Sequence, residues 1–585
     1  MLDADFLNCR LPEGQSFTAI VKHKQIYVDK TDLIYKLALN RKPILLTRPR
    51  RFGKSTIVST LEELFTHGVK PFVDADGNLK ESYFKGLAIE KLWKDDGDYK
   101  VIHIDFSTFD TDTTAYICDV RPDLRNNDKA EVYAQFFNYN FCNFIKDIAF
   151  KFGVELSSNK ITPSKLFEDL IKKLGENKVV FLVDEYDFPL THIPSDLASS
   201  EHEDYLSKIS MILKSFYSLI KSNSKYFRKI FVTGITRFKG VSMLTLGNTI
   251  SDISLSIDFG TIVGFTRAEL KKYFYDHLVM SVALLKNKSE DQVSMSDIET
   301  LLDQLASWYD GYSFDENAQS HVFSTVSVIN FFCNSNARTK FKNYWYELGG
   351  PPTILVNNCQ KILDSDIDNA FKEDSEFWVT EDAFKNPSSY ESMEPKVMLY
   401  QTGYLTLAKT IDSDVYLKFP NLEIRSSFAK LQYLYLFKNS EKLITSGFNQ
   451  ELSKLNFETP LEKIVEYFST ILNVLDYQKN AFTHECHVVN PIFCYLYAKK
   501  FNVMQEKHSL VCRADLVIDF DNKSTLVFEF KFRKTGSAKT AEDLLNEALQ
   551  QIKEKQYTQI PDRKVKGYAL VFDQETKKFV AFKQS

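Results

Sequence analysis

A glycine–lysine–serine turn near the N-terminus has residue types that suit the binding of a phosphate group. The turn reads TRPRRFGKST, residues 47–56, and lies between a short apolar run and an amphipathic segment. Gly53 lets the backbone approach a phosphate, Lys54 neutralises phosphate charge, and the Ser55 hydroxyl is a ligand for Mg²⁺. Arg48 replaces the first glycine of the usual GxxxxGK[ST] pattern. A basic turn before an ordinary helix is the alternative, but the strand–turn–helix order favours a site for Mg-ATP.

Two acids at the end of another apolar run supply the partner that such a turn needs. The run VVFLVDE, residues 179–185, ends in Asp184 and Glu185. These carboxylates are tolerated after a buried strand if they emerge at the carboxyl edge of the sheet, where ligands bind. We expect Asp184 to hold the magnesium, through water, and Glu185 to polarise the attacking water. Asp187 either contacts the residues of this site without contacting the metal itself, or caps the segment that follows, and we favour the cap.

Four further residues are candidates for contact with the nucleotide. Arg51 and Thr56 belong to the phosphate turn, where Arg51 and its neighbour Arg50 contact either phosphates or structural carboxylates. Thr233 ends a third apolar run, so it either senses the γ-phosphate or is simply the residue at which a strand ends. Arg237 either stabilises γ-phosphate charge, in its own chain or toward a neighbouring copy in a homo-oligomer, or forms a surface salt bridge. We favour the salt bridge.

A second set of acids, accompanied by a lysine, lies near the C-terminus. Two predicted strands, residues 514–520 and 525–532, are joined by a short turn and form a hairpin. Glu529 and Lys531 are two residues apart and therefore share one face of their strand. A three-residue loop sets Asp515 directly opposite Glu529, whereas a four-residue loop puts the two acids on opposite faces.

Two carboxylates and a lysine on one face of a sheet are suited to phosphodiester chemistry. Asp515 and Glu529 would chelate one or two Mg²⁺ ions, which polarise the phosphate and generate hydroxide. Lys531 would orient the nucleophile or stabilise the charge that develops on the phosphate. Phe528 and Phe530 take the opposite face, where we expect a helix to pack on them. A surface salt-bridge cluster is the alternative, and the pattern taken alone is weak.

Short apolar runs alternate with amphipathic segments through the first 264 residues, which predicts a doubly wound α/β domain with a parallel sheet. The predicted strands are residues 43–47, 101–105, 179–183 and 230–233, with 257–259 as a further candidate. The following pattern is mainly helical, and the C-terminal part returns to strands. The sequence thus predicts a P-loop α/β domain at 1–264, a mainly helical middle or lid region at 265–480, and a smaller α/β domain at 481–585.

Composition excludes several classes of protein. The chain has 585 residues and a net charge of −5, so the whole molecule does not attract nucleic acid strongly. Residues 501–585 carry 15 Lys/Arg against 12 Asp/Glu, a weak bias toward nucleic acid. The eight cysteines are scattered without a CxxC pair, which argues against a disulfide framework or a zinc site. Without a secretory leader or an apolar run of membrane-spanning length, a cytoplasmic protein with no membrane partner is expected.

The order of motifs in the first two thirds of the chain resembles a known group. The motifs are YVDKTDLIYKL, LLTRPRRFGKST, FLVDEYDFPL, TGITRFKGVSM, WYDGY, YWYELGGPPTIL and YQTGYLTL, within residues 17–425. Together they are similar to the predicted AAA-ATPase-like family of P-loop NTPases, whose phosphate loop also reads RPRRFGKS. This resemblance implies binding and hydrolysis of ATP and does not imply a particular remodelling substrate.

The C-terminal region resembles the PD-(D/E)XK nuclease superfamily, in particular the nuclease domain fused behind this type of ATPase. The matching positions are Arg513-Ala514-Asp515, Glu529-Phe530-Lys531 and Gln551-Ile552 with Tyr557. The resemblance implies that Glu506 is a further acid at or behind the metal and that Gln551 lies beside the metal on the core helix. Leu510 and Cys512 stand where glycines are usual in this family.

The leading hypothesis from the sequence is an ATP-dependent or ATP-regulated nuclease. ATP and Mg²⁺ are the expected cofactors, and nucleic acid, with DNA favoured only by family analogy, is the expected partner. The alternative is a regulatory or scaffold ATPase whose nuclease-like domain binds nucleic acid or protein without cleavage. The negative net charge of the chain outside residues 501–585 and the altered loop at Leu510 and Cys512 favour that alternative somewhat.

Overall fold

The fold is given by a computed structural model, which forms two compact units. The first unit is Met1–Leu348 with Trp378–Asn421, and the second is Gly349–Phe377 with Leu422–Ser585. The structure describes residues 4–12, 16–74, 76–124, 128–157, 162–194, 196–237, 250–337, 340–348, 350, 352, 355–356, 358, 361–362, 375–387, 393–437, 446–475, 482–504, 514–520, 523–555 and 563–585.

A five-stranded parallel sheet forms the centre of the first unit. Its strands, in spatial order, are β4 (Lys100–Asp105), β5 (Val179–Asp184), β6 (Phe227–Gly234), β1 (Ile44–Thr47) and β7 (Ser251–Asp252). Every residue of β5 is buried, as expected for a parallel strand covered on both faces. The strands predicted at 43–47, 101–105, 179–183 and 230–233 and the α/β fold class are therefore confirmed.

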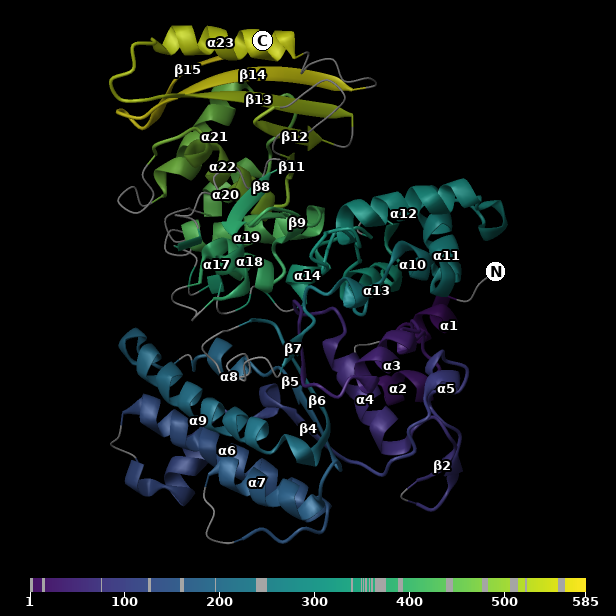
Figure 1. Ribbon diagram of the computed structural model, residues 1–585. Helices are drawn as coiled ribbons and strands as arrows, with labels where there is room; N and C mark the ends of the chain where they lie inside the picture. Colours follow the sequence, from purple (N-terminus) through teal and green to yellow (C-terminus); the bar gives the residue numbers. More distant parts are fainter. Residues whose placement is uncertain are drawn as a thin grey trace. The chain divides into compact units, whose positions relative to one another are not determined.

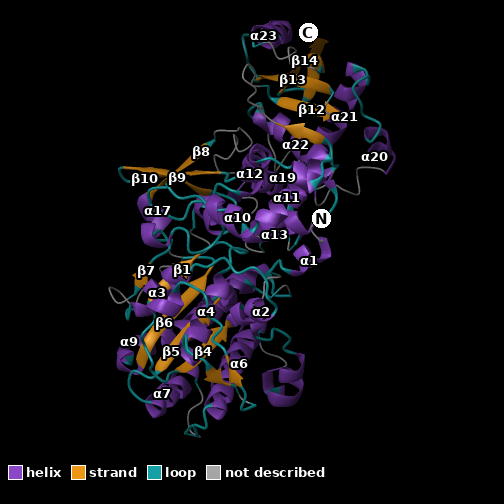
Figure 2. Cartoon of the chain, turned by 90° about the vertical axis from the view of Figure 1, so that its right-hand side faces the viewer, coloured by secondary structure: helices purple, strands orange, loops and turns teal. Residues whose placement is uncertain are grey.

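Helices cover both faces of this sheet, which Figure 2 shows as one layer of strands between helices. One side carries α6 (Lys129–Lys151), α7 (Pro163–Leu174) and α9 (His202–Ser222), and the other carries α2 (Phe17–Lys22), α3 (Thr31–Leu39) and α4 (Lys54–His67) (Figure 1). Phe167 of α7 and Phe216 of α9 pack against Phe181 of β5, with ring centres 5.0 and 6.0 Å away. Smaller elements of this part are α1 (Ala4–Cys9), β2 (Phe72–Val73), β3 (Leu79–Lys80), α5 (Ile89–Leu92) and α8 (Phe188–Thr191).

The expectation of a strand at residues 257–259 is wrong. Ile257–Phe259 forms a single helical turn, and the strand that extends the sheet is β7, which lies earlier in the chain and pairs with β1. Ile257 is 55% exposed. Its side chain is apolar but is not buried in the sheet. The short apolar run therefore resembles a buried strand without being one.

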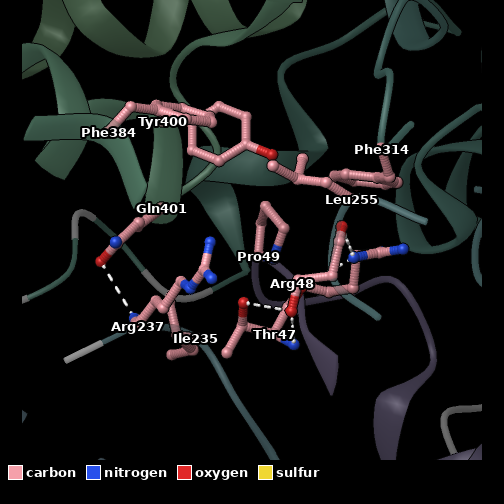
Figure 3. Close-up of a pocket in the computed structure, with 11 residues that line it drawn as sticks. Thr47, Arg48, Pro49, Ile235, Arg237, Leu255, Phe314, Phe384, Tyr400 and Gln401 are labelled. Carbon is pink, nitrogen blue, oxygen red and sulfur yellow. Dashed lines mark hydrogen bonds between the residues drawn. The ribbon is translucent and has the colours of Figure 1, made fainter. Parts of the chain in front are cut away.

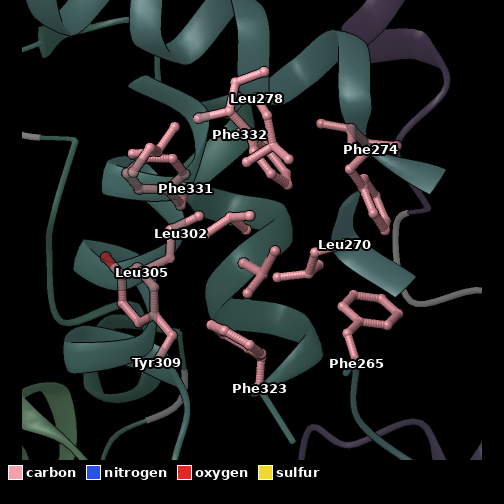
Figure 4. Close-up of a cluster of buried hydrophobic side chains, with 14 of the residues drawn as sticks. Phe265, Leu270, Phe274, Leu278, Leu302, Leu305, Tyr309, Phe323, Phe331 and Phe332 are labelled. Carbon is pink, nitrogen blue, oxygen red and sulfur yellow. The ribbon is translucent and has the colours of Figure 1, made fainter. Parts of the chain in front are cut away.

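The middle of the first unit is mainly helical and has its own apolar core (Figure 4). Its helices are α10 (Arg267–Tyr273), α11 (Tyr275–Lys286), α12 (Met295–Tyr309), α13 (Thr325–Cys333) and α14 (Tyr344–Glu347). Leu270, Phe274, Leu302 and Phe331 lie within that core and are fully buried. A small three-stranded sheet with two helices follows, made of β8 (Glu376–Thr380), α17 (Glu381–Lys385), α18 (Pro395–Gln401), β9 (Thr406–Ile411) and β10 (Asp414–Lys418), in which β9 and β10 pair antiparallel.

The second unit contains a mixed five-stranded sheet between helices. Its strands, in spatial order, are β11 (Asn502–Met504), β12 (Leu516–Phe520), β13 (Ser524–Arg533), β14 (Lys564–Asp573) and β15 (Lys578–Gln584). Only β13 and β14 pair in parallel among these described strands. The helices are α19 (Leu422–Phe437), α20 (Ser446–Leu452), α21 (Leu461–Asn473), α22 (Cys486–Ala498) and α23 (Ala541–Glu554). Helix α23 covers one face and α21 the other (Figure 1).

Among the described residues, the helices are too short or too polar for any of them to span a lipid bilayer.

Candidate functional site

The phosphate turn connects β1 to α4 and brings the helix N-terminus to the carboxyl edge of the sheet. Gly53 has a φ of 93°, and a Cβ added there would lie no closer than 3.9 Å to a neighbouring atom, so the backbone conformation and not crowding requires glycine. Arg51 has a φ of 72°, and Thr325 holds this turn by donating a hydrogen bond of 2.7 Å to the Arg51 carbonyl. Ser55 is exposed and Thr56 half-buried in the first turn of α4. The geometry suits an anion at the helix N-terminus.

Lys54 lies inside this turn. Its ammonium group donates a hydrogen bond of 3.1 Å to the carbonyl of Pro49, and the residue is only 6% exposed. Burial lowers the pKa of Lys54, and the negative charges of Asp184, Glu185 and Asp187 oppose this shift. A phosphate held in the turn would provide a counter-charge next to the ammonium group.

The acids at the end of β5 emerge at the same edge of the sheet. Strand β6 lies between β5 and β1 and runs parallel to both, so the acids and the phosphate turn follow strand ends that point the same way. Asp184 is buried, and Glu185 has a φ of 46°. Burial raises the pKa of Glu185, while the positive charges of Lys54 and Arg50 oppose that rise. A positive φ at a non-glycine residue is a strained conformation that is often found at functional sites.

Asp187 does not cap a helix with its side chain, which corrects the favoured prediction. It precedes α8 but makes no capping hydrogen bond there. Its carboxylate instead accepts hydrogen bonds from the backbone N–H groups of Ile235 (3.2 Å) and Thr236 (2.7 Å), and from the Thr236 hydroxyl. A Cβ at Gly234 would collide with Asp187 Oδ1, so only glycine fits there. Asp187 therefore ties the acidic segment to the residues that follow β6.

Thr233 and Arg237 have partners away from the phosphate turn. The Thr233 hydroxyl donates a hydrogen bond of 2.8 Å to the carbonyl of Leu46, and the residue is fully buried. Arg237 Nε lies 2.8 Å from Asp252 Oδ2. These contacts favour the structural alternatives, a strand end and a salt bridge, and the salt bridge is half-buried rather than at the surface.

Arg48, which stands in place of the first glycine, is a buried structural side chain (Figure 3). Its guanidinium group donates hydrogen bonds to the carbonyls of Thr47, Ser254 and Phe259, and it lies 4.6 Å from the centre of the Phe314 ring. Burial lowers the pKa of Arg48 to about 10. The cavity beside it has a volume of about 20 Å³, which has room for about one water molecule and not for a nucleotide.

The second site lies on one face of the sheet in the second unit. The hairpin pairs Phe520 with Ser524 and Leu516 with Phe528, which is the register of the three-residue loop. Asp515 directly precedes β12, and its Oδ2 accepts a hydrogen bond of 2.7 Å from the backbone N–H of Phe530. Its carboxylate thus reaches β13 beside Glu529. On the opposite face Phe528 packs on α21, as predicted.

Glu529 is a buried acid that is only partly satisfied. It is 1% exposed, and Lys531 Nζ lies 3.1 Å from its Oε1. Within the part of the chain that the structure describes, its Oε2 has no hydrogen-bond partner. Burial and the charge of Asp515 raise the pKa of Glu529 to about 8, against the opposing charge of Lys531. A divalent cation would satisfy both carboxylates, so the residues present fit a metal site.

The helices place further residues near this pair. Gln551 is half-buried in α23, next to Ile552, which packs on the sheet. Lys555, one turn further along, opposes the rise in the pKa of Glu529 by its charge. Glu485 precedes α22, and its charge acts to raise the pKa of Lys531. Glu485 was not predicted from the sequence, although an acid at the start of an apolar helix that precedes the hairpin was a usable signal.

Several predicted residues cannot be placed. Glu506 and Tyr557 lie outside the described residues, as do Leu510 and Cys512. Over the described ranges, no group of three or more His, Cys, Asp or Glu side chains that could hold a metal is found. The pair of Asp515 and Glu529 therefore provides two carboxylates, and Glu506 stays a prediction for a third.

The fold and the two sites define a P-loop α/β unit joined in one chain to a nuclease-type α/β unit. Residues 14–244 match the family model described as "Predicted AAA-ATPase". Residues 483–582 match the model of the PD-(D/E)XK nuclease superfamily. Both resemblances recognised in the sequence are confirmed, and the chain combines an AAA-ATPase-like region with a C-terminal region of the PD-(D/E)XK type.

Individual proteins are also similar to this chain. An "Uncharacterized protein in vnfD 5'region" of Azotobacter chroococcum mcd 1 is 25% identical over 559 residues, covering 94% of this chain and 93% of that protein. Among solved structures, Cdc6p from Pyrobaculum aerophilum is 11% identical and matches 69% of this chain and 95% of its own, with a TM-score of 0.23.

Proposed function

We propose that the first unit binds and hydrolyses Mg-ATP and that the second unit cleaves phosphodiester bonds of nucleic acid, with DNA as the expected substrate. The observation that carries the nuclease half is Glu529, a fully buried acid that lies beside Asp515 and contacts Lys531, and one of whose oxygens has no hydrogen-bond partner among the described residues. Burying an acid whose oxygens are only partly hydrogen-bonded costs free energy, and a bound metal ion would offset that cost. Carboxylates that share a site are ligands of Mg²⁺.

In the first unit, each residue has a separate task. The N–H groups at the start of α4 and the Lys54 ammonium group bind the phosphates. The Ser55 hydroxyl and Asp184 would hold Mg²⁺, which neutralises the phosphate charge when bound. Glu185 orients the attacking water and accepts its proton, and its raised pKa makes it a stronger base than an ordinary glutamate.

In the second unit, Asp515 and Glu529 would hold the metal, which lowers the pKa of a bound water when present. The hydrogen bond from the Phe530 N–H fixes the carboxylate of Asp515. Burial acts to lower the pKa of Lys531, but the charges of the nearby acids, Glu529 first among them, outweigh burial and raise it. Lys531 therefore remains protonated and stabilises negative charge on the phosphate.

The ATPase half is tested by phosphate release and by ATP binding in the full chain. Lys54→Ala should abolish both, because the phosphates lose their buried counter-charge. Lys70→Ala is the matched control, since Lys70 is exposed and its side chain is 70% accessible. Phosphate release by the Lys54 variant at the wild-type rate would refute the assignment.

The nuclease half is tested by cleavage of plasmid DNA with Mg²⁺ or Mn²⁺. Asp515→Asn and Lys531→Met should each lower the cleavage rate by about 100-fold or more, the range seen when one group that stabilises a transition state is removed. Lys534→Met is the control, because Lys534 is an exposed lysine three residues along the chain. DNA binding without cleavage in the wild type would instead support the scaffold alternative.

A further inference from the structure

The residues expected to contact the terminal phosphate are largely engaged elsewhere. Thr233 donates its hydroxyl hydrogen to the sheet, and Arg237 pairs with Asp252. The Arg51 guanidinium carbon lies 5.5 Å from the centre of the Trp345 ring, in a cation–π contact. Phosphoryl transfer nevertheless needs positive charge near the terminal phosphate in addition to the turn lysine and the metal.

Among the residues that the structure describes, Arg50 is the remaining cation of the phosphate turn that could contact the terminal phosphate. It is half-buried in the phosphate turn, and its charge acts on both Lys54, the expected phosphate-binding lysine, and Glu185, the expected base. Its Nη2 lies 2.8 Å from Nε2 of His192, and over the described part of the chain no other hydrogen-bond partner of Arg50 is found. A guanidinium group has five N–H donors, so most of them remain for a ligand.

His192 is held firmly and has one role for each ring nitrogen. Its ring stacks on Phe188, with ring centres 3.9 Å apart and planes inclined by 12°. Its Nδ1 lies 2.8 Å from the Thr191 hydroxyl and 3.3 Å from the Phe188 carbonyl. Because arginine can only donate, Nε2 must accept, and the proton of the neutral ring is on Nδ1. His192 follows the acidic residues Asp184 and Glu185 in the chain, so its contact holds the Arg50 side chain on the side of the turn that is nearer to Glu185.

We propose that Arg50 contacts the terminal phosphate of bound ATP and stabilises its negative charge, and that His192 is the positioning residue for the Arg50 side chain. The inference rests on the proposed ATP site in the first unit. It assigns Arg50, rather than Arg51, as the arginine of the phosphate turn that reads the γ-phosphate. Arg51 serves the turn itself through its strained backbone and its contact with Trp345.

The test compares the affinities for Mg-ATP and Mg-ADP by calorimetry in the full chain, and then kcat and KM for phosphate release. Arg50→Ala should reduce the preference for ATP over ADP by about 10-fold to 100-fold, the range for one lost charge-assisted hydrogen bond, and leave ADP affinity unchanged. Arg41→Ala is the matched control, because Arg41 is exposed and lies outside the phosphate turn, and it should keep that preference. Arg51→Ala is measured beside it to separate the two arginines of the turn. The kcat of Arg50→Ala should fall by about 100-fold or more, as for other arginines that contact a transferred phosphoryl group, with KM changed much less.

His192 is tested by rescue. His192→Ala should lower kcat about 10-fold, the typical cost of a misplaced catalytic group, and His192→Gln should recover much of it, because its amide oxygen accepts from Arg50 as Nε2 does. In the Arg50→Ala background, His192→Ala should have no further effect. Arg50→Lys, with circular dichroism as a check, covers the case in which the alanine variant does not fold.

Each possible failure contradicts a different assignment. If the wild type binds neither nucleotide, the proposed ATP site fails and the role of Arg50 falls with it. If the wild type prefers ATP and Arg50→Ala keeps that preference, or if Arg51→Ala loses it instead, the assignment of Arg50 is wrong while the ATP site stands. If Arg50→Ala behaves as expected and His192→Ala equals the wild type, the positioning role is overturned.

Discussion

Replacement of Glu529 by glutamine should remove a pH-dependent loss of stability from the second unit. Burial and Asp515 raise the pKa of Glu529 from 4.5 to about 8. The folded protein therefore holds this proton more tightly than the unfolded chain does. Stability contributed by the protonated acid is complete below pH 4.5 and is lost as the pH rises through 8. The full loss is about 5 kcal/mol, from about 1.4 kcal/mol for each pKa unit.

Hydrogen exchange followed by mass spectrometry measures this loss within the full chain. Peptides of β13 and β14 report the opening of the second unit, and peptides of β5 and β6 serve as an internal reference. In metal-free wild type, the opening free energy of β13 should fall by several kcal/mol between about pH 5 and about pH 8.5, after correction for intrinsic exchange. In Glu529→Gln it should stay nearly constant, and Mg²⁺ should restore protection at the higher pH only in the wild type.

Glu547→Gln is the control for the change of side-chain chemistry. Glu547 is an exposed residue of α23 that pairs with Lys539 at 2.6 Å, so its loss should not alter the pH dependence. Equal pH profiles for wild type and Glu529→Gln would show that Glu529 titrates like an ordinary acid. That result would refute a buried, coupled pair of acids that is ready to bind a metal.

Three other substitutions test the first unit. Arg48→Met should destabilise it by about 3 kcal/mol, because buried carbonyls lose their donor, and calorimetric unfolding would show an unchanged transition if the buried arginine were dispensable. Gly311→Ala should destabilise the first unit far more than Gly86→Ala does, because a Cβ at Gly311 would collide with the Pro420 carbonyl oxygen. Gly86 also has a positive φ but has open space around it, so it is the control for backbone strain. Equal melting temperatures of the two variants would contradict this prediction. Asp187→Asn should lower kcat for ATP about 10-fold with ATP binding retained, since it loosens the segment after β6, and a kcat equal to wild type would leave Asp187 without this role.

Local sequence patterns are sufficient to predict those features of the structure that depend on one segment of the chain. The buried strands of the first sheet are predictable because continuous apolar runs are typical of parallel strands covered on both faces. The sequence predicts that Asp515 and Glu529 lie on the same face if the hairpin loop has three residues and on opposite faces if it has four, since loop length sets hairpin register. The structure shows the three-residue register, with Phe520 paired to Ser524.

Contacts between distant segments cannot be predicted in the same way. Arg50 and His192 are separated by 142 positions in the chain, and nothing in either local pattern indicates their hydrogen bond. The direction of the Thr233 hydroxyl depends on the neighbouring strand, where it finds the Leu46 carbonyl. Asp187 precedes a helix, as a cap does, yet its partners belong to the end of another strand. These roles arise only when the sheet brings the strand ends together.

Crystals of the full chain grown with a non-hydrolysable ATP analogue and Mn²⁺ would test the central claim, that the protein has two separate sites for a divalent cation. Anomalous difference maps should show one manganese peak between Ser55 and Asp184 beside the nucleotide, and a second between Asp515 and Glu529. Absence of the second peak at millimolar Mn²⁺, with Glu529 still buried against Lys531, would contradict the nuclease half of the account. Nucleotide bound away from Lys54 would contradict the other half.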